Sequence, residues 1–192
     1  MLEEIEEYAK VNRIPIMQKD GIEYLCEFIK ENDIKNILEI GSAIGYSALK
    51  MASVRDDIKV TTIERDEERY KKAVENIHLF NLDDRINIIW GDAMDTVVDG
   101  KFDLIFIDAS KGHNIDFFNK YKVNLDKNGY IITDNLSFHG LVEDPSLAVT
   151  KNQKGIVRKI SNYIAFLDNN LEFDTEYVSV GDKIAISRRK YE

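Results

Sequence analysis

Five short runs rich in β-branched and aromatic residues alternate along the chain with segments whose apolar residues recur at helical spacing. The runs that we predict as strands are residues 36–40, 58–63, 86–90, 102–107 and 130–133. The segments that we predict as helices lie near residues 20–32, 45–54, 66–80, 112–124 and 153–169. Strands that alternate with helices are typical of a parallel sheet whose two faces are covered by helices. The chain is therefore expected to have an α/β fold.

The last part of the chain has a different pattern. Residues 173–180 and 183–187 are predicted as two further strands, and Gly181 and Asp182 between them form a typical two-residue hairpin turn. The predicted sheet thus has seven strands, mostly parallel, and ends in an antiparallel β-hairpin. Sheets of the dinucleotide dehydrogenases normally continue with parallel strands instead.

Helix starts and chain length complete the predicted organisation. Asp20 and Asp66 occupy positions where N-caps are expected. A chain of 192 residues without repeats, low-complexity tracts or a proline-rich linker fits one domain. We therefore predict a single domain over residues 1–192.

Charge and hydropathy exclude some classes of protein. The 26 cations and 35 anions give a net charge of −9, which argues against broad adhesion to phosphate backbones or anionic lipid. No apolar run approaches the roughly 20 residues of a membrane helix. The acidic N-terminus also lacks the basic-then-apolar order of a signal peptide. We expect a cytoplasmic protein that has no membrane partner.

A glycine turn follows the first predicted strand. Gly41 and Gly45 allow the backbone to turn tightly and to approach a ligand closely, although a purely structural turn is the alternative. Glu64, at the end of the second strand, is placed to accept hydrogen bonds from ribose hydroxyls. Asp92, after the third strand, is placed to meet an adenine amino group. The pattern therefore predicts an adenosyl ligand.

Two features decide between a nicotinamide dinucleotide and S-adenosylmethionine as that ligand. The third glycine of the dinucleotide fingerprint is missing, and Ala43 replaces the middle one. The terminal hairpin also favours the methyl donor. The predicted architecture is accordingly a Rossmann-like class I methyltransferase fold.

A second group of polar residues follows the fourth and fifth strands. Asp108 ends one strand and the pair Asp134 and Asn135 ends the next, so their oxygens should converge at the carboxyl edge of the sheet. Two carboxylates and an amide suit Mg²⁺, with Mn²⁺ or Ca²⁺ as alternatives. A solvated turn is the other interpretation of the Asp134 and Asn135 pair.

Lys111 is the candidate general base. It lies three residues after Asp108, at the predicted start of a helix that would aim its ammonium group at the same pocket. Methyl transfer to oxygen requires a deprotonated hydroxyl in line with the sulfonium methyl group, and a nearby lysine could take that proton. The alternative is an ordinary surface lysine.

These motifs resemble the cation-dependent O-methyltransferases, a family that includes the catechol and caffeoyl-CoA O-methyltransferases. The resemblance covers nearly the whole chain, and its carriers are residues 38–47, 62–66, 107–111 and 133–135. It implies a divalent cation, a homodimer and Lys111 as the general base. The implied metal ligands are Asp108, Asp134 and Asn135. The implied donor-binding residues are Met17, Glu39, Gly41, Ser47, Glu64, Asp92, Ala93 and Asp108.

Within that family, four segments look most like the bacterial tRNA 5-hydroxyuridine methyltransferases, which make 5-methoxyuridine at the wobble position. The segments are residues 13–17, 21–23, 39–47 and 61–70. The resemblance implies the tRNA anticodon loop as partner. The alternative function is methylation of a small-molecule acceptor of the catechol or caffeoyl-CoA type. A third hypothesis is a noncatalytic adenosyl-binding domain.

A tRNA partner requires a local basic surface on an acidic protein. Two runs are candidates for contacts to anticodon phosphates, although either could be a solvated face. They are Lys151, Lys154, Arg158 and Lys159, and Arg188, Arg189 and Lys190. Phe138 could stack on a presented base or pack in the core.

Overall fold

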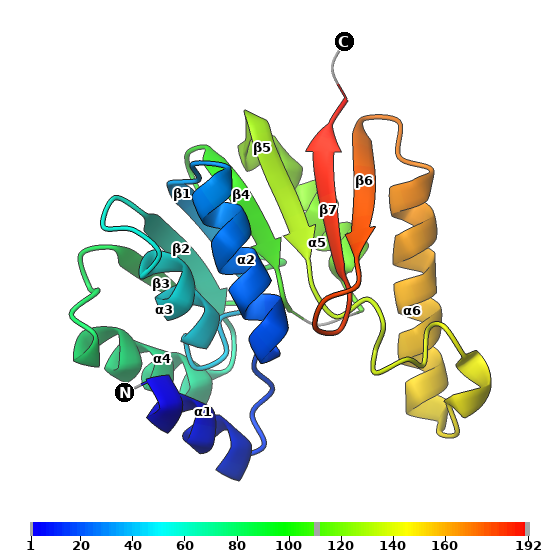
Figure 1. The fold of residues 1–192 in the computed structure, drawn as a ribbon, viewed down its shortest axis with the longest axis horizontal. Coiled ribbons are helices and arrows are strands. Elements are labelled where there is room, and N and C mark those ends of the chain that lie inside the picture. Colours follow the sequence, from blue (N-terminus) through cyan, green and yellow to red (C-terminus); the bar gives the residue numbers. More distant parts are fainter. Residues whose placement is uncertain (1, 110–111, 191–192) are drawn as a thin grey trace.

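The computed structural model describes residues 2–109 and 112–190 and contains one seven-stranded sheet with helices on both faces (Figure 1). The strands are β1 (Asn36–Ile40), β2 (Lys59–Glu64), β3 (Ile86–Trp90), β4 (Phe102–Ile107), β5 (Leu125–Thr133), β6 (Phe173–Val178) and β7 (Ile184–Arg189). The helices are α1 (Leu2–Val11), α2 (Lys19–Glu31), α3 (Tyr46–Ala52), α4 (Glu67–Leu79), α5 (Asn114–Tyr121) and α6 (Lys151–Asp168). Short 3₁₀ helices cover Lys122–Asn124 and Pro145–Leu147.

The strand order is β3-β2-β1-β4-β5-β7-β6. Strands β1 to β5 pair in parallel, whereas β7 pairs antiparallel with both β5 and β6. The predicted α/β class, the seven strands and the antiparallel end of the sheet are thereby confirmed. The five parallel strands all end at one edge, which is where ligands bind in open α/β sheets.

Two apolar clusters lie on opposite faces of the sheet. The first joins α2, α3 and α4 to one face through residues such as Ile22, Leu49 and Ile77. The second joins α5 and α6 to the other face through residues such as Phe118 and Tyr163. In Figure 1, α2 lies in front of the sheet and α5 behind it. Alternate side chains of one buried strand therefore serve different cores, as the near-continuous apolar runs of parallel strands require.

Helix α1 was not predicted. Its first turn is acidic, and only Ile5 and Ala9 among its residues are buried. The Tyr46 hydroxyl donates a hydrogen bond of 2.7 Å to the Glu6 carboxylate, which ties α1 to the first turn of α3. Two buried apolar residues give a weak periodic pattern, so this helix depends on a tertiary partner.

Of the two predicted N-caps, one is right and one is wrong. Asp66 caps α4, because its carboxylate accepts a hydrogen bond from the backbone N–H of Arg69. Helix α2 instead begins after Gln18, and Asp20 lies inside its first turn. The Asp20 carboxylate accepts the backbone N–H of Gly181 at 3.0 Å. Asp20 therefore bonds to a turn distant in sequence instead of capping α2.

The two-residue hairpin turn is also wrong. Strands β6 and β7 pair from Val178 to Ile184, which leaves a connection of residues 179–183. Asp182 is 4% exposed, and its carboxylate and carbonyl oxygens accept backbone N–H groups of the segment after β5. This long-range bonding lengthens the turn beyond the local two-residue form.

No described helix is both long and apolar enough to span a membrane.

A buried hydroxyl pair links α6 to the sheet and gives a stability prediction. The Thr133 hydroxyl lies 2.7 Å from the Tyr163 hydroxyl, and both side chains are buried. Tyr163→Phe leaves the Thr133 hydroxyl without this partner, so we expect a loss of about 1–2 kcal/mol of unfolding free energy in urea titrations. Tyr177→Phe is the matched control, because its hydroxyl binds Asp168 near the surface and should contribute less than about 0.5 kcal/mol. Equal losses in both variants would contradict the assignment.

Candidate functional site

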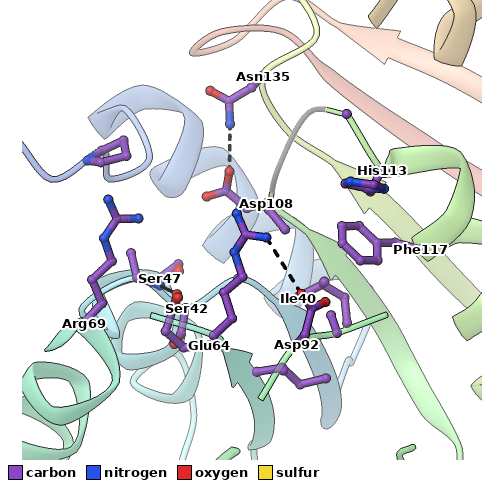
Figure 2. A pocket seen from close by; sticks show the side chains of 18 of the residues that line it. Ile40, Ser42, Ser47, Glu64, Arg69, Asp92, Asp108, His113, Phe117 and Asn135 are labelled. Atoms are coloured by element: carbon purple, nitrogen blue, oxygen red, sulfur yellow. Dashed lines mark hydrogen bonds and ion pairs between the residues drawn. The ribbon is translucent and has the colours of Figure 1, made fainter. Parts of the chain in front are cut away.

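A cavity of about 610 Å³ opens at the carboxyl edge of the parallel strands. It lies where β1 and β4 are neighbours but their following segments lead to opposite faces of the sheet, the usual ligand site of such folds. Figure 2 shows Asp108 and Asn135 facing each other, with Ser42, Ser47 and Glu64 at one side and His113 and Phe117 at another. The size is within the range of small-molecule sites.

The predicted site residues are mostly in the wall of this cavity. Eight of them line it: Met17, Gly41, Ser47, Glu64, Asp92, Ala93, Asp108 and Asn135. Glu39 and Asp134 are buried beside it and do not form the wall. Lys111 lies outside the described residues, so its assignment stays a prediction.

The glycine turn is fixed by a close backbone approach. Gly41 has φ +94°, and a Cβ at this position would lie 2.6 Å from the carbonyl oxygen of Asp108. The Gly41 N–H donates to the Ile63 carbonyl at 3.0 Å. Position 41 therefore needs glycine both for its left-handed backbone and for the space beside β4.

Glu64 holds this turn through its carboxylate. One oxygen accepts the backbone N–H of Ala43 and the other accepts that of Asp66, each at 2.8 Å. A carboxylate oxygen has two lone pairs, so each oxygen can accept one further hydrogen bond. Since Glu64 also lines the cavity, this capacity is available to a ligand hydroxyl.

Glu39 lies beneath the cavity. Its side chain is fully buried, and it accepts hydrogen bonds from the hydroxyls of Ser47 and Thr62. Burial raises the pKa of Glu39 to about 7, while the two hydroxyl donors partly oppose this shift. Glu39 therefore orients Ser47, which is in the wall, and has no surface of its own toward a ligand.

Asp92 also lines the cavity. One carboxylate oxygen accepts the backbone N–H of Met94 at 2.8 Å, and the other lies 3.8 Å from the Arg65 guanidinium. Its side chain is partly exposed. Asp92 thus has one structural hydrogen bond and further acceptor capacity that faces the cavity.

Asp108, Asp134 and Asn135 meet as the sequence predicted. The Asn135 amide nitrogen donates to Asp108 Oδ1 at 2.7 Å and to Asp134 Oδ2 at 3.3 Å. Within the described ranges there is no group of three His, Cys, Asp or Glu side chains that could hold a metal. A cation here would therefore use the two carboxylates and would require the Asn135 amide to present its oxygen instead of its nitrogen.

Only one of the two basic runs lies beside the cavity. Asn152, Ile156 and Lys159 of α6 line the wall at helical spacing, and Lys151, Lys154 and Arg158 are exposed beside them.

The C-terminal run lies toward the opposite edge of the sheet, because β7 runs antiparallel to β5 and Arg188 comes after the residues that pair with the end of β5. Arg189 and Lys190 form ion pairs with Glu172 and Asp174. The C-terminal run is therefore not part of the surface around the cavity, and its role in phosphate contacts stays a prediction.

Sequence reasoning missed Ser42 as a site residue. Its side chain is 2% exposed and lines the cavity, and its hydroxyl oxygen has no hydrogen-bond partner among the described residues. Its position between Gly41 and Ala43 in the turn is the feature that could have identified it. Phe138, considered as a stacking residue, packs against the apolar cluster under α5 and α6.

Comparison with known proteins identifies the family. A family model described as O-methyltransferase matches residues 1–190. The chain belongs to this O-methyltransferase family.

Relatives of this O-methyltransferase agree over nearly the whole chain. A Staphylococcus aureus structure, described as a candidate caffeoyl-CoA O-methyltransferase, is 37% identical, with a TM-score of 0.94, 98% of this chain covered and 92% of that chain. A Bacillus cereus O-methyltransferase solved with S-adenosylhomocysteine is 25% identical, with a TM-score of 0.83, 98% of this chain covered and 90% of that chain. The caffeoyl-CoA O-methyltransferase of Stellaria longipes is 29% identical over 166 residues, which are 82% of this chain and 69% of that protein. The protein is an S-adenosylmethionine-dependent O-methyltransferase.

The buried Glu39 carboxyl predicts a pH-dependent stability. Its pKa is raised from 4.5 to about 7, so its stabilising contribution is full below pH 4.5 and is lost as the pH rises through 7. Glu39→Gln removes this titration. Between pH 4.5 and pH 8, the unfolding free energy of the variant should therefore gain about 3 kcal/mol relative to that of the natural protein. Urea titrations of both proteins at the two pH values measure this gain, and a difference that does not vary with pH would contradict it.

Proposed function

We propose that this O-methyltransferase methylates one oxygen of a vicinal oxygen pair held by a divalent cation, and that its acceptor is 5-hydroxyuridine at the wobble position of tRNA. The observation that carries the cation-dependent part is the meeting of Asp108, Asp134 and Asn135 at the cavity. The observation that carries the tRNA part is the basic surface of α6 beside that cavity.

Several polar groups in the wall suit the methyl donor. The buried Ser42 hydroxyl lacks a partner among the described residues, and such a group is costly unless a ligand or water satisfies it. We assign the ribose hydroxyls to the remaining acceptor capacity of Glu64 and the adenine amino group to Asp92. Ser47, oriented by Glu39, is assigned to the methionine end of the donor.

The cation site would be made of oxygen ligands. Asp108 and Asp134 both lie within hydrogen-bond distance of the same Asn135 amide, so the two carboxylates converge on one small volume. Two carboxylates and an amide oxygen fit Mg²⁺, which keeps its remaining positions for water or substrate oxygens. When bound, such a cation lowers the pKa of an acceptor hydroxyl and fixes its direction.

The chemical step is a direct displacement. The acceptor hydroxyl loses its proton to the neutral amine form of Lys111, the assigned general base, which becomes an ammonium group, and the hydroxyl oxygen forms a bond to the donor methyl carbon. The bond between that carbon and sulfur breaks, the electron pair stays on sulfur, and S-adenosylhomocysteine leaves. The 5-hydroxyl and the neighbouring O4 of the base form the vicinal pair that this arrangement needs.

Charge supports a nucleic-acid acceptor. Lys151, Lys154 and Arg158 are exposed, and no carboxylate of the described chain lies within ion-pair distance of them. With no counter-ion among the described residues, these three side chains are suited to phosphates that flank a base inserted in the cavity. On a protein of net charge −9, these three cations concentrate the attraction for phosphates at the cavity rim.

The relatives favour a second candidate, a small catechol-like acceptor. Named relatives such as the Stellaria longipes protein are caffeoyl-CoA O-methyltransferases. A catechol presents the same vicinal oxygens as 5-hydroxyuridine, so one cation site can serve both. The two candidates differ in whether the α6 surface contributes to acceptor binding.

Cation dependence gives the first functional prediction. Asp108→Ala removes one of the two carboxylates, so we expect methyl transfer to fall at least about 100-fold and Mg²⁺ to no longer restore activity after chelation. The measurement is transfer of a labelled methyl group, with thermal unfolding followed by circular dichroism as the control for folding. Full activity of Asp108→Ala in the presence of a chelator would refute the cation mechanism.

Acceptor choice gives the second prediction. Hydroxylated but unmethylated tRNA should yield 5-methoxyuridine, measured by mass spectrometry of the nucleosides. Neutralising Lys151, Lys154 and Arg158 to Ala should raise the KM for tRNA roughly tenfold because phosphate contacts are lost. The matched control replaces Lys30, Lys59 and Lys127, three exposed lysines outside the cavity wall, and should change the KM less than about twofold. Methylation of catechols alone would reject the tRNA acceptor and leave the cation mechanism intact.

A further inference from the structure

The segment after β5 has an unusual backbone. Asn135, Phe138 and His139 all have positive φ, at 68°, 50° and 58°, and Gly140 continues the left-handed run at 85°. Side chains larger than glycine rarely adopt this conformation, least of all a bulky phenylalanine. Such a segment persists only where its surroundings fix it. It begins with Asn135, a residue of the proposed cation site.

The turn between β6 and β7, residues 179–183, supplies these constraints. The backbone N–H groups of Leu136 and Ser137 donate to the carbonyls of Lys183 and Asp182 at 3.0 and 2.9 Å. The N–H of His139 donates to Asp182 Oδ1 at 2.7 Å. Three of the six residues of the segment are therefore bonded to two residues of one turn.

Asp182 is the central residue of this contact. Its side chain is 4% exposed, and its second carboxylate oxygen, Oδ2, has no hydrogen-bond partner among the described residues. The His139 ring lies 3.9 Å from Oδ1 and is mostly exposed. A buried carboxylate is costly unless it makes strong hydrogen bonds, and its bond to the His139 N–H is charge-assisted.

The turn is also fixed from its other side. The Gly181 N–H donates to the Asp20 carboxylate at 3.0 Å, which joins the turn to the first residues of α2. Gly181 lies so close to Gly21 that a Cβ on Gly181 would be 3.2 Å from the Gly21 Cα. The turn therefore has a firm support on α2 from which Asp182 reaches the 135–140 segment.

We propose that Asp182 is a positioning residue for the cation site: its buried carboxylate holds the left-handed 135–140 segment so that Asn135 stays opposite Asp108. The proposal rests on the proposed function in one respect, the binding of a divalent cation by Asp108, Asp134 and Asn135. Asp182 does not line the cavity, so it acts through Asn135 and not on substrate.

The test measures cation binding and donor binding separately. Mn²⁺ is titrated into the full chain and free Mn²⁺ is followed by electron paramagnetic resonance, while S-adenosylhomocysteine binding is followed by calorimetry. Asp182→Ala should raise the Kd for Mn²⁺ about tenfold, since loss of a group that orients metal ligands costs 10- to 100-fold in affinity. The Kd for S-adenosylhomocysteine should change less than about twofold. General loosening of the fold would instead weaken the binding of both ligands.

Asp20→Ala is the matched control. It removes the α2 carboxylate that accepts the Gly181 N–H of this turn but leaves every bond between the turn and the 135–140 segment, so the Kd for Mn²⁺ should stay within about twofold of the natural value. If Asp182→Ala does not fold, Asp182→Asn is tested in its place. A neutral acceptor weakens the hydrogen bond from the His139 N–H, so this variant should raise the Kd for Mn²⁺ about threefold.

The outcomes separate the inference from the proposed function. Mn²⁺ binding by the natural protein with an unchanged Kd in the folded Asp182 variants overturns the positioning role alone. An equal loss of Mn²⁺ and S-adenosylhomocysteine binding overturns it as well. Absence of Mn²⁺ binding in the natural protein contradicts both the cation mechanism and the inference drawn from it.

Discussion

At the centre of the sheet, the segment after β1 passes so close to the segment after β4 that a Cβ on residue 41 would lie 2.6 Å from the Asp108 carbonyl oxygen. This approach places the glycine turn and Asp108 in one cavity wall. Donor and acceptor groups of a methyl transfer must be held within contact distance, and a rigid backbone contact achieves this without long side chains. The remaining parts of the site are arranged around this contact.

Buried carboxylates keep the strand ends in place. Glu64 accepts backbone N–H groups from the turn after β1 and from the turn after β2, so one side chain connects two cavity-forming segments. Glu39 fixes the Ser47 hydroxyl from below. Asp182 holds the segment that carries Asn135. In each case a carboxylate satisfies backbone or hydroxyl donors that burial would otherwise leave unpaired.

The overall negative charge and the basic α6 surface affect different properties of the protein. Net charge governs solubility and long-range attraction, whereas acceptor binding depends on local charge at the cavity rim. Helix α6 presents its cavity-lining residues Asn152, Ile156 and Lys159 next to an exposed basic row, and this arrangement follows from helical spacing alone. A capping box formed by Thr150 and Gln153 begins the helix two residues earlier than the apolar pattern predicts.

The sequence by itself determined the fold class, the approximate strand positions apart from the early start of β5 at Leu125, and the residues at the carboxyl edge. Strand periodicity is local, and all parallel strands end at the same edge, so Gly41, Glu64, Asp108 and Asn135 could be placed together without coordinates. Only the tertiary structure showed that Glu39 lies beneath the cavity, that the C-terminal basic run lies at the far edge, and that Asp182 bonds to the segment after β5. Those facts depend on contacts between residues distant in sequence, where a hydrogen-bond partner is chosen by burial and geometry and leaves no periodic pattern in the chain.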